Sequence, residues 1–177
     1  MVVSRFIKAL GIGIALSLAL GLALVWWVTP TRAATCTWTG ATDTDWATPG
    51  NWANCGGSVP GAGDTATVPV TPTNQPVIGA AAVITVDGLM IEAGASLNVD
   101  GQLTLQGNVD GDGDLTVRTG GAMWWTGGTM RDAGTTHIAA GAALTLAGTS
   151  GKYLRVDRVF INAGRVVYQD TGELQLY

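Results

Sequence analysis

Basic residues are almost absent from the middle of this chain. No Lys or Arg occurs from Ala34 to Val117, whereas nine acidic residues lie between Asp43 and Asp114. Charged residues of both signs make up only 12% of the 177 residues, and the formal net charge is -4. Proteins that bind the phosphates of nucleic acids need a basic surface. The composition therefore excludes nucleic acid as the partner.

Histidine and cysteine are also scarce, with one His and two Cys in the chain. Zinc sites use closely spaced Cys and His ligands, and the chain has no Cys-x-x-Cys pair, so metal binding by the thiols is the less favoured interpretation. An exported chain with an even number of cysteines is expected to form a disulfide. We therefore predict a bridge between Cys36 and Cys55. The single histidine, His137, occupies the outward position of a short strand pattern, which indicates a surface residue and not a base or ligand.

Long apolar segments are missing from most of the chain, but one lies near its start. Residues 9–28 form an apolar run that follows a basic start, and Pro30 and the small residue Ala33 come after it. This order is typical of a secretory signal peptide over residues 1–33. The run is also long enough to span a bilayer, so a retained signal anchor that contacts the membrane through residues 9–28 is the alternative. Both predict an extracytoplasmic location, secreted or at the cell surface.

Helical periodicity is lacking, whereas glycine is abundant, with 26 residues. Between the glycines one apolar-polar-apolar triad keeps returning, as in Leu103-Thr104-Leu105. Such alternation is typical of short strands with two side chains inward and one outward, and it predicts an all-β fold. The side chains expected to face inward are Leu97, Val99, Leu103, Leu105, Leu115, Val117, Ile138, Leu144, Leu146, Leu154, Val156, Leu174 and Leu176.

A longer repeat organises these strands. A Gly-Ala-x-(Leu or Trp) pattern recurs at Gly94, Gly121 and Gly141, with a looser copy at Gly164, so the intervals are 27, 20 and 23 residues. A period in this range is one coil of a β-helix. We predict a right-handed parallel β-helix (β-solenoid) of about four coils over residues 77–177. Because the strand pattern continues to the last residue and leaves the last coil open, we expect the sequence to be the N-terminal part of a longer protein.

A Trp-rich segment, residues 34–76, lies between the leader and the repeats. Trp38, Trp46 and Trp52 all fall between the two cysteines, and a Pro-rich connector follows. Three indoles are a large apolar surface for so short a segment. We favour a disulfide-stapled cap over the first coil, since terminal repeats need one. A platform on which a glycan stacks against the three indoles is the alternative.

The stretches TWTG, NW, VPG and DTATVP of this segment resemble the opening of many exported bacterial proteins with parallel β-helix repeats, including autotransporter-like and adhesin-like surface proteins. The later stretches GGAMWWTGGTM and GTTHIAAGAALTLAG resemble the repeat units of the same proteins. The resemblance implies a structural or adhesive stalk whose partner is an extracellular ligand, such as a glycan or a host or cell surface. The family does not require the cysteine pair.

One acidic stretch resembles a metal site. Asn108, Asp110, Asp112 and Asp114 alternate with Val and Gly, as oxygen ligands do in the first half of a calcium loop. The twelfth position is Thr119, however, where such a loop carries Glu. We therefore favour a plain corner of the solenoid and expect no cofactor, with Ca2+ as the one candidate.

The same acids, with Arg118 or Arg131, would be the reacting groups if the chain were a polysaccharide lyase or hydrolase, because some parallel β-helices are such enzymes. They lie in one local turn instead of on successive coils, so we predict a non-catalytic protein. A carbohydrate-active enzyme or a carbohydrate-binding module is the alternative. Trp124 and Trp125 must face opposite sides of a strand, so one is expected in the core and the other exposed or packed under a loop.

Overall fold

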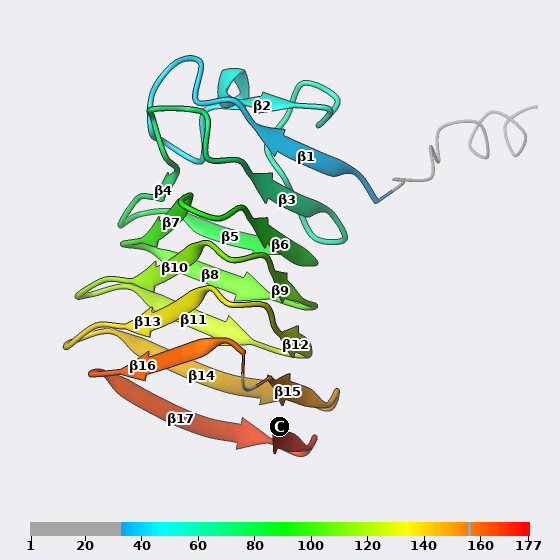
Figure 1. Cartoon of the computed structure of the whole chain (residues 1–177), viewed down its shortest axis with the longest axis vertical. Helices are drawn as coiled ribbons and strands as arrows, with labels where there is room; N and C mark the ends of the chain where they lie inside the picture. The colour runs from blue at the N-terminus through cyan, green and yellow to red at the C-terminus, as the bar shows by residue number, and fades with distance from the viewer. Residues whose placement is uncertain (1–32, 156) are drawn as a thin grey trace, which may run out of the picture. The chain divides into compact units, whose positions relative to one another are not determined.

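Strands make up nearly all the regular structure in residues 33–155 and 157–177, the part of the chain that this computed structural model describes (Figure 1). Except for Ala33, the predicted leader over residues 1–33, with its apolar run at 9–28, lies outside the described residues. A short 3-10 helix, η1, covers Pro49–Asn51. The strands are β1 Thr35–Trp38, β2 Trp52–Ala53, β3 Thr65–Val68, β4 Val77–Ile78, β5 Val83–Val86, β6 Gly88–Ile91, β7 Ser96–Val99, β8 Gln102–Leu105, β9 Val109–Asp110, β10 Asp114–Val117, β11 Ala122–Trp125, β12 Gly128–Met130, β13 Thr135–Ile138, β14 Ala143–Gly148, β15 Lys152–Leu154, β16 Val159–Asn162, β17 Arg165–Asp170 and β18 Leu174–Leu176.

The strands stack into three sheets that form the sides of a solenoid (Figure 1). Sheet A has the order β18-β15-β12-β9-β6-β3-β1-β2, sheet B the order β16-β13-β10-β7-β4, and sheet C the order β17-β14-β11-β8-β5. Every third strand therefore returns to the same sheet, and its neighbours there are parallel except in the β1–β2 pair. The predicted all-β parallel solenoid is confirmed, with about five coils, β3-β4-β5 to β15-β16-β17, in place of about four.

The core forms because equivalent apolar residues stack on one another. In sheet C, Leu103 pairs with Met123 and Met123 with Leu144, and all three side chains are buried. Burial of one such side chain contributes about 1.5–3 kcal/mol. The predicted inward residues from Leu97 to Leu146 are buried, but Leu176 in the final strand is 71% exposed because no further coil covers it in the structure. Leu154 is half-buried, Leu174 is exposed, and Val156 lies outside the described residues.

The strand register corrects the first copy of the repeat. Gly94 precedes β7 in sheet B, whereas Gly121 and Gly141 precede β11 and β14 in sheet C. The residue equivalent to Gly121 is Gly101, because Gln102 pairs with Ala122. The interval of 27 residues was therefore measured between Gly94 and Gly121, which lie before strands of two different sheets, and it is not the length of one coil. A local Gly-Ala pattern marks any corner and does not identify which sheet follows it.

The Trp-rich segment lies over the first coil, as the cap interpretation predicts. β1 adds to sheet A beside β3, with Thr35 opposite Thr65, and β2 is the outermost strand. β2 has only two residues, and such a short edge leaves few unpaired backbone groups. β3 itself belongs to the first coil although it lies within residues 34–76, which is why the solenoid has an additional coil.

Candidate functional site

The three indoles between the cysteines form one packed cluster inside the capping segment. The Trp38 and Trp52 rings lie 5.0 Å apart, and those of Trp46 and Trp52 lie 4.6 Å apart, both edge to face. The three side chains are 1%, 0% and 7% exposed, respectively, for Trp38, Trp46 and Trp52. A sugar ring needs an open aromatic face for stacking. The glycan-contact prediction for these three residues is therefore corrected: they form the core of the cap.

Hydrogen bonds fix two of these rings. The Nε1–H of Trp38 donates to the carbonyl of Asn74 at 2.7 Å, and that of Trp52 donates to the carbonyl of Trp46 at 2.8 Å. The Nε1–H of Trp46 is buried and has no acceptor among the described residues. The bond to Asn74 ties β1 to the loop before β4, so the indole cluster also attaches the cap to the first coil.

Asn51 is the polar centre of the capping segment and is fully buried. Its Oδ1 accepts hydrogen bonds from the backbone N–H groups of Thr42 and Asp43 at 2.8 and 3.2 Å. Its Nδ2 donates to Oδ1 of Asp43 at 2.7 Å and to the carbonyl of Asp45. The hydrogen bond from Asn51, followed by that from the Asp45 backbone, lowers the pKa of the Asp43 carboxyl. The network closes the loop around Trp46 and therefore stabilises the cap.

The predicted disulfide is present. Cys36 in β1 bonds to Cys55 after β2, with the two Cα atoms 4.9 Å apart and a sequence separation of 19. Both residues belong to the same buried cluster as the three indoles. The bridge thus joins β1, the strand between β2 and β3 in sheet A, to the loop that closes the cap.

We expect the double substitution of Cys36 and Cys55 to alanine to lower the free energy of unfolding by about 3 kcal/mol, because the bridge restricts the unfolded chain. Urea unfolding followed by tryptophan fluorescence measures this difference. A reducing agent should shift the wild-type midpoint downward and leave the midpoint of the variant in place. Equal midpoints for the wild type and the variant in the absence of reductant would contradict the prediction.

The acidic stretch forms the corner between sheet A and sheet B of one coil, and its oxygens bond to the next coil. Oδ1 of Asn108 accepts from the backbone N–H of Thr129 at 2.9 Å, and Oδ1 of Asp112 accepts from that of Ala133 at 2.8 Å. Oδ1 of Asp110 accepts from Nε of Arg131 at 2.6 Å. Each bond joins residues 21 apart in sequence, which is one coil.

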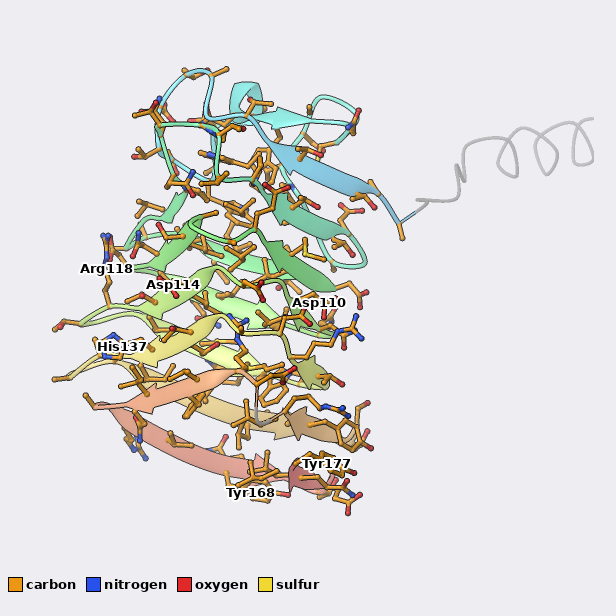
Figure 2. All side chains as sticks on the ribbon, in the orientation of Figure 1. Asp110, Asp114, Arg118, His137, Tyr168 and Tyr177 are labelled. Carbon is orange, nitrogen blue, oxygen red and sulfur yellow. A yellow bond between two sulfur atoms is a disulfide. The ribbon has the colours of Figure 1, made fainter. Side chains whose placement is uncertain are left out.

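The spacing of these carboxyl groups does not suit a metal ion. Asp110 ends β9 in sheet A and Asp114 begins β10 in sheet B, so they lie on different sides of the corner (Figure 2). Within residues 33–155 and 157–177, no three His, Cys, Asp or Glu side chains are grouped so that they would hold a metal ion. The stretch that resembles half of a calcium loop is built as a corner of the solenoid.

Arg158 is the residue at this corner that the sequence did not reveal. It comes from the fifth coil, yet it is 3% exposed. Its Nε donates to Oγ1 of Thr136 at 2.9 Å, and its Nη1 and Nη2 donate to the carbonyls of Gly111 and Gly113 at 3.0 and 3.3 Å. The same two nitrogens also reach the carbonyls of Arg131 and Thr135 at 3.2 Å.

Nearby acids favour the charged form of Arg158. Burial lowers the pKa of its guanidinium group, and the negative charge of Asp114, followed by Asp132, Asp110 and Asp112, counteracts this effect. The acids that resembled a catalytic cluster therefore interact favourably with a buried structural cation. Of the two arginines proposed from the sequence, Arg131 pairs with Asp110, whereas Arg118 pairs with Asp100 at 3.5 Å and lies on another part of the surface.

His137 lies at the outward position of β13, between Thr116 and Ile161 in sheet B. It is half-buried and lies on the outside of the stack (Figure 2). The predicted outward placement is confirmed.

Trp124 and Trp125 face opposite sides of β11, as predicted. Trp125 is 2% exposed and donates its Nε1–H to the carbonyl of Gly127 at 2.5 Å. Trp124 is 40% exposed on the outside of sheet C. The sequence could not decide which indole is exposed, because both have apolar neighbours in the chain. The register decides it: Trp125 stacks on Leu105 and Leu146, and Trp124 stacks on Thr104 and Thr145.

The outer surface around Trp124 is the candidate interaction surface, and we call it the sheet C face. It consists of the outward side chains of β5, β8, β11 and β14 in two parallel rows. None of these side chains ionises. The rows are Val83, Gln102, Ala122 and Ala143, and Thr85, Thr104, Trp124 and Thr145.

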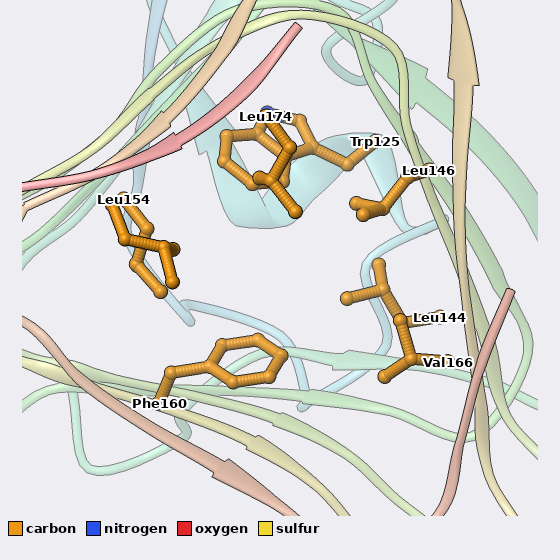
Figure 3. Close-up of a pocket in the computed structure, with 8 residues that line it drawn as sticks. Trp125, Leu144, Leu146, Leu154, Phe160, Val166 and Leu174 are labelled. Carbon is orange, nitrogen blue, oxygen red and sulfur yellow. The ribbon is translucent and has the colours of Figure 1, made fainter. Parts of the chain in front are cut away.

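A second apolar feature lies at the last coil. A hollow of about 220 Å³ is open at the end of the stack (Figure 3). Phe160, Val166 and Leu174 lie on its open side, and Trp125 and Leu144 lie deeper in it. It is the end of the hydrophobic core, where Val166 and Leu174 in the last strands have a stacked neighbour on one side only.

Two observations bear on where the protein resides. Among the residues that the structure describes, no helix has the length and apolar character needed to cross a bilayer. The disulfide between Cys36 and Cys55 indicates a non-reducing environment, because cytosolic thiols are kept reduced.

The comparisons with known proteins identify a family but not an activity. No curated protein and no solved structure matched the chain. One family model, described as a domain of unknown function (DUF8693), matches residues 37–145, from β1 into β14. The matched region begins one residue after Cys36, contains the three indoles of the cap and the sheet C face, and ends before Arg158. Because the match covers more than half of its length, the chain belongs to the DUF8693 family.

Proposed function

We propose that this chain is a non-catalytic, exported β-solenoid that serves at the cell surface as a structural or adhesive stalk, in a protein of the autotransporter-like or adhesin-like kind. The observation that supports this best is that polar side chains of the corner join one coil to the next. Asn108, Asp112 and Asp132 each accept a hydrogen bond from a backbone N–H of a neighbouring coil. Such bonds stiffen a stack of coils and favour a supporting role.

The cap supports an exported location. The disulfide fastens β1, which is next to the outermost strand of sheet A. A covalent bridge at the end of a stack restricts fraying of the terminal strand, where local unfolding starts. Such protection is useful outside the cell, where proteases and surfactants act on loose ends.

An enzyme acting on polysaccharides is the less favoured alternative. Hydrolysis or elimination needs carboxyl or basic groups that converge on one bound sugar. Here Arg158 is buried and donates to carbonyls, and Asp110 and Asp112 bond to the adjacent coil. A carbohydrate-binding module is the other alternative, and the exposed indole of Trp124 on the uncharged sheet C face favours it.

The location tests the main proposal. The full chain and a variant that lacks residues 1–33 are expressed with the same tag, and intact cells are treated with protease. We expect the full chain to be degraded from outside and its two cysteines to resist a thiol-alkylating reagent, whereas the shortened variant stays protected and is alkylated. A full chain that remains protected with both thiols reactive would refute export.

A second measurement tests the absence of catalysis. The purified full chain is incubated with neutral and uronic-acid polysaccharides, and new reducing ends and unsaturated products are measured. We expect no release above that of a sample without protein. Turnover that the substitution Arg131→Ala abolishes would show an enzyme.

A further inference from the structure

The sheet C face carries no charge over the first four coils of the solenoid, and Arg165 is the residue that follows Ala143 in the fifth coil. The eight outward side chains of this face, from β5, β8, β11 and β14, include no acid and no base. The outside of sheet A carries Asp110 and Arg131, and the outside of sheet B carries Asp114. The chain has a net charge of -4, so a neutral surface that extends over four coils distinguishes the sheet C face as a candidate binding surface.

Trp124 lies within this neutral side. It is 40% exposed, and its neighbours in the row, Thr104 and Thr145, lie one strand away on either side, at about 4.8 Å. Threonine at the same position of three other coils shows that the fold does not need an indole there. An exposed indole between two hydroxyl groups therefore points to contact with something outside the chain.

The chemistry of the two rows fits a sugar. A pyranose ring has an apolar C–H face, which packs against an aromatic ring, and a rim of hydroxyl groups, which bond to polar side chains. Trp124 supplies the aromatic face, and Thr85, Thr104, Thr145 and Gln102 supply donors and acceptors. Binding sites commonly combine an aromatic surface with a few polar groups in this way.

The charge pattern selects among glycans. The row that contains Trp124 has no cation for a uronic acid, sulfate or phosphate and continues in β17 with Val167, whereas Arg165 follows Ala143 at the end of the other row. The net negative charge of the chain also repels such groups. A protein partner is less favoured because its interface needs a cluster of large apolar side chains, whereas the neighbours of Trp124 on this face are small or polar. We propose that the sheet C face binds a neutral glycan, with one sugar ring stacked on Trp124 and the chain running across the strands along the row from Thr85 to Thr145.

This inference rests on the proposed function, because it names the ligand class of the adhesive stalk. Its test uses the full chain and titration calorimetry with four hexasaccharides. Cellohexaose, mannohexaose and N-acetylchitohexaose are the neutral probes, and hexagalacturonate is the anionic probe. We expect at least one neutral probe to bind and hexagalacturonate not to bind.

The variant Trp124→Thr carries the residue that neighbouring coils hold, so its fold should persist. We expect its affinity for the neutral probe to fall at least about tenfold, the loss expected when an aromatic contact is removed. Met90→Thr is the matched control, because Met90 is an exposed apolar residue on the outside of sheet A. It should bind as the wild type does.

Three outcomes of the calorimetry would overturn the inference. They are binding to no neutral probe, equal affinity of the wild type and Trp124→Thr, and preferential binding of hexagalacturonate. Loss of adhesion to a protein-coated surface in Trp124→Thr, without any glycan binding, would assign the face to a protein and would also overturn it. Each of these outcomes leaves the stalk proposal standing if protease reaches the chain on intact cells. A chain that is protected from protease and has both thiols reactive refutes the stalk proposal, whatever the result with the glycans.

Discussion

Replacing Arg158 with alanine is expected to lower the free energy of unfolding by about 3–5 kcal/mol, close to the loss seen when a buried charged group is removed from its partners. The guanidinium group donates to Oγ1 of Thr136 and to four backbone carbonyls. Without it, the carbonyls of Gly111 and Gly113 lose these donors, and each buried polar group left unpaired costs about 1–3 kcal/mol. The surrounding acids also lose the cation that balances them.

The measurement is urea unfolding followed by far-UV circular dichroism. Arg131→Ala is the control, because the Arg131 side chain is 52% exposed and its ion pair with Asp110 lies on the surface; surface pairs contribute about 0–1 kcal/mol. Arg158→Lys keeps the charge but not the fork of donors, and we expect a loss between those of the two alanine variants. If Arg158→Ala and Arg131→Ala lose the same stability, the role given to Arg158 is wrong.

Replacing Gly128 with alanine is the second change with a large expected effect. Gly128 has a φ of +93°, and a Cβ placed on it would meet the Cα of Gly107 in the preceding coil at 2.8 Å. The positive φ costs an L-residue about 1–2 kcal/mol, and forcing an extra methyl group into a packed site costs about 1–3 kcal/mol more. Because the obstacle is backbone, the coils themselves must separate, and we expect a loss near the sum of both costs.

Gly120→Ala separates the two causes. Gly120 has nearly the same φ, +87°, but no atom lies within 4 Å of a Cβ placed there. We expect this variant to lose only the conformational cost, about 1–2 kcal/mol. Thermal unfolding of both variants alongside the wild type measures the difference. Equal losses for Gly120→Ala and Gly128→Ala would show that the close approach of Gly107 and Gly128 is unimportant.

Local alternation was a reliable guide to the core of the solenoid. Leu97, Leu115 and Leu144 face inward as the triads predict, because successive side chains of a strand point to opposite faces whatever the neighbouring strands are. The pairing of Cys36 with Cys55 followed from an even cysteine count in a chain expected to be exported. The first inference depends only on residues that are close in sequence, and the second depends on the chain having only two cysteines.

Local patterns were a poor guide to which coil contacts which. Gly94 resembled Gly121 in sequence but precedes a different sheet. For Trp38 the sequence favoured the core of a cap and left a glycan platform as the alternative, and only the packing of the cap showed the side chain to be buried. The likeness between two short segments does not show which residue of the adjacent coil a given residue stacks on.

The sequence by itself therefore determined the all-β class, the inward residues of most strands and the disulfide, because strand periodicity and cysteine chemistry act locally. Only the tertiary structure decided that Arg158 fills the corner after β9 and that Trp124, not Trp125, lies outside. Arg158 contacts Gly111 across 47 residues of sequence. Such contacts depend on the register with which the coils stack, and the register is set by the packing of all the coils together.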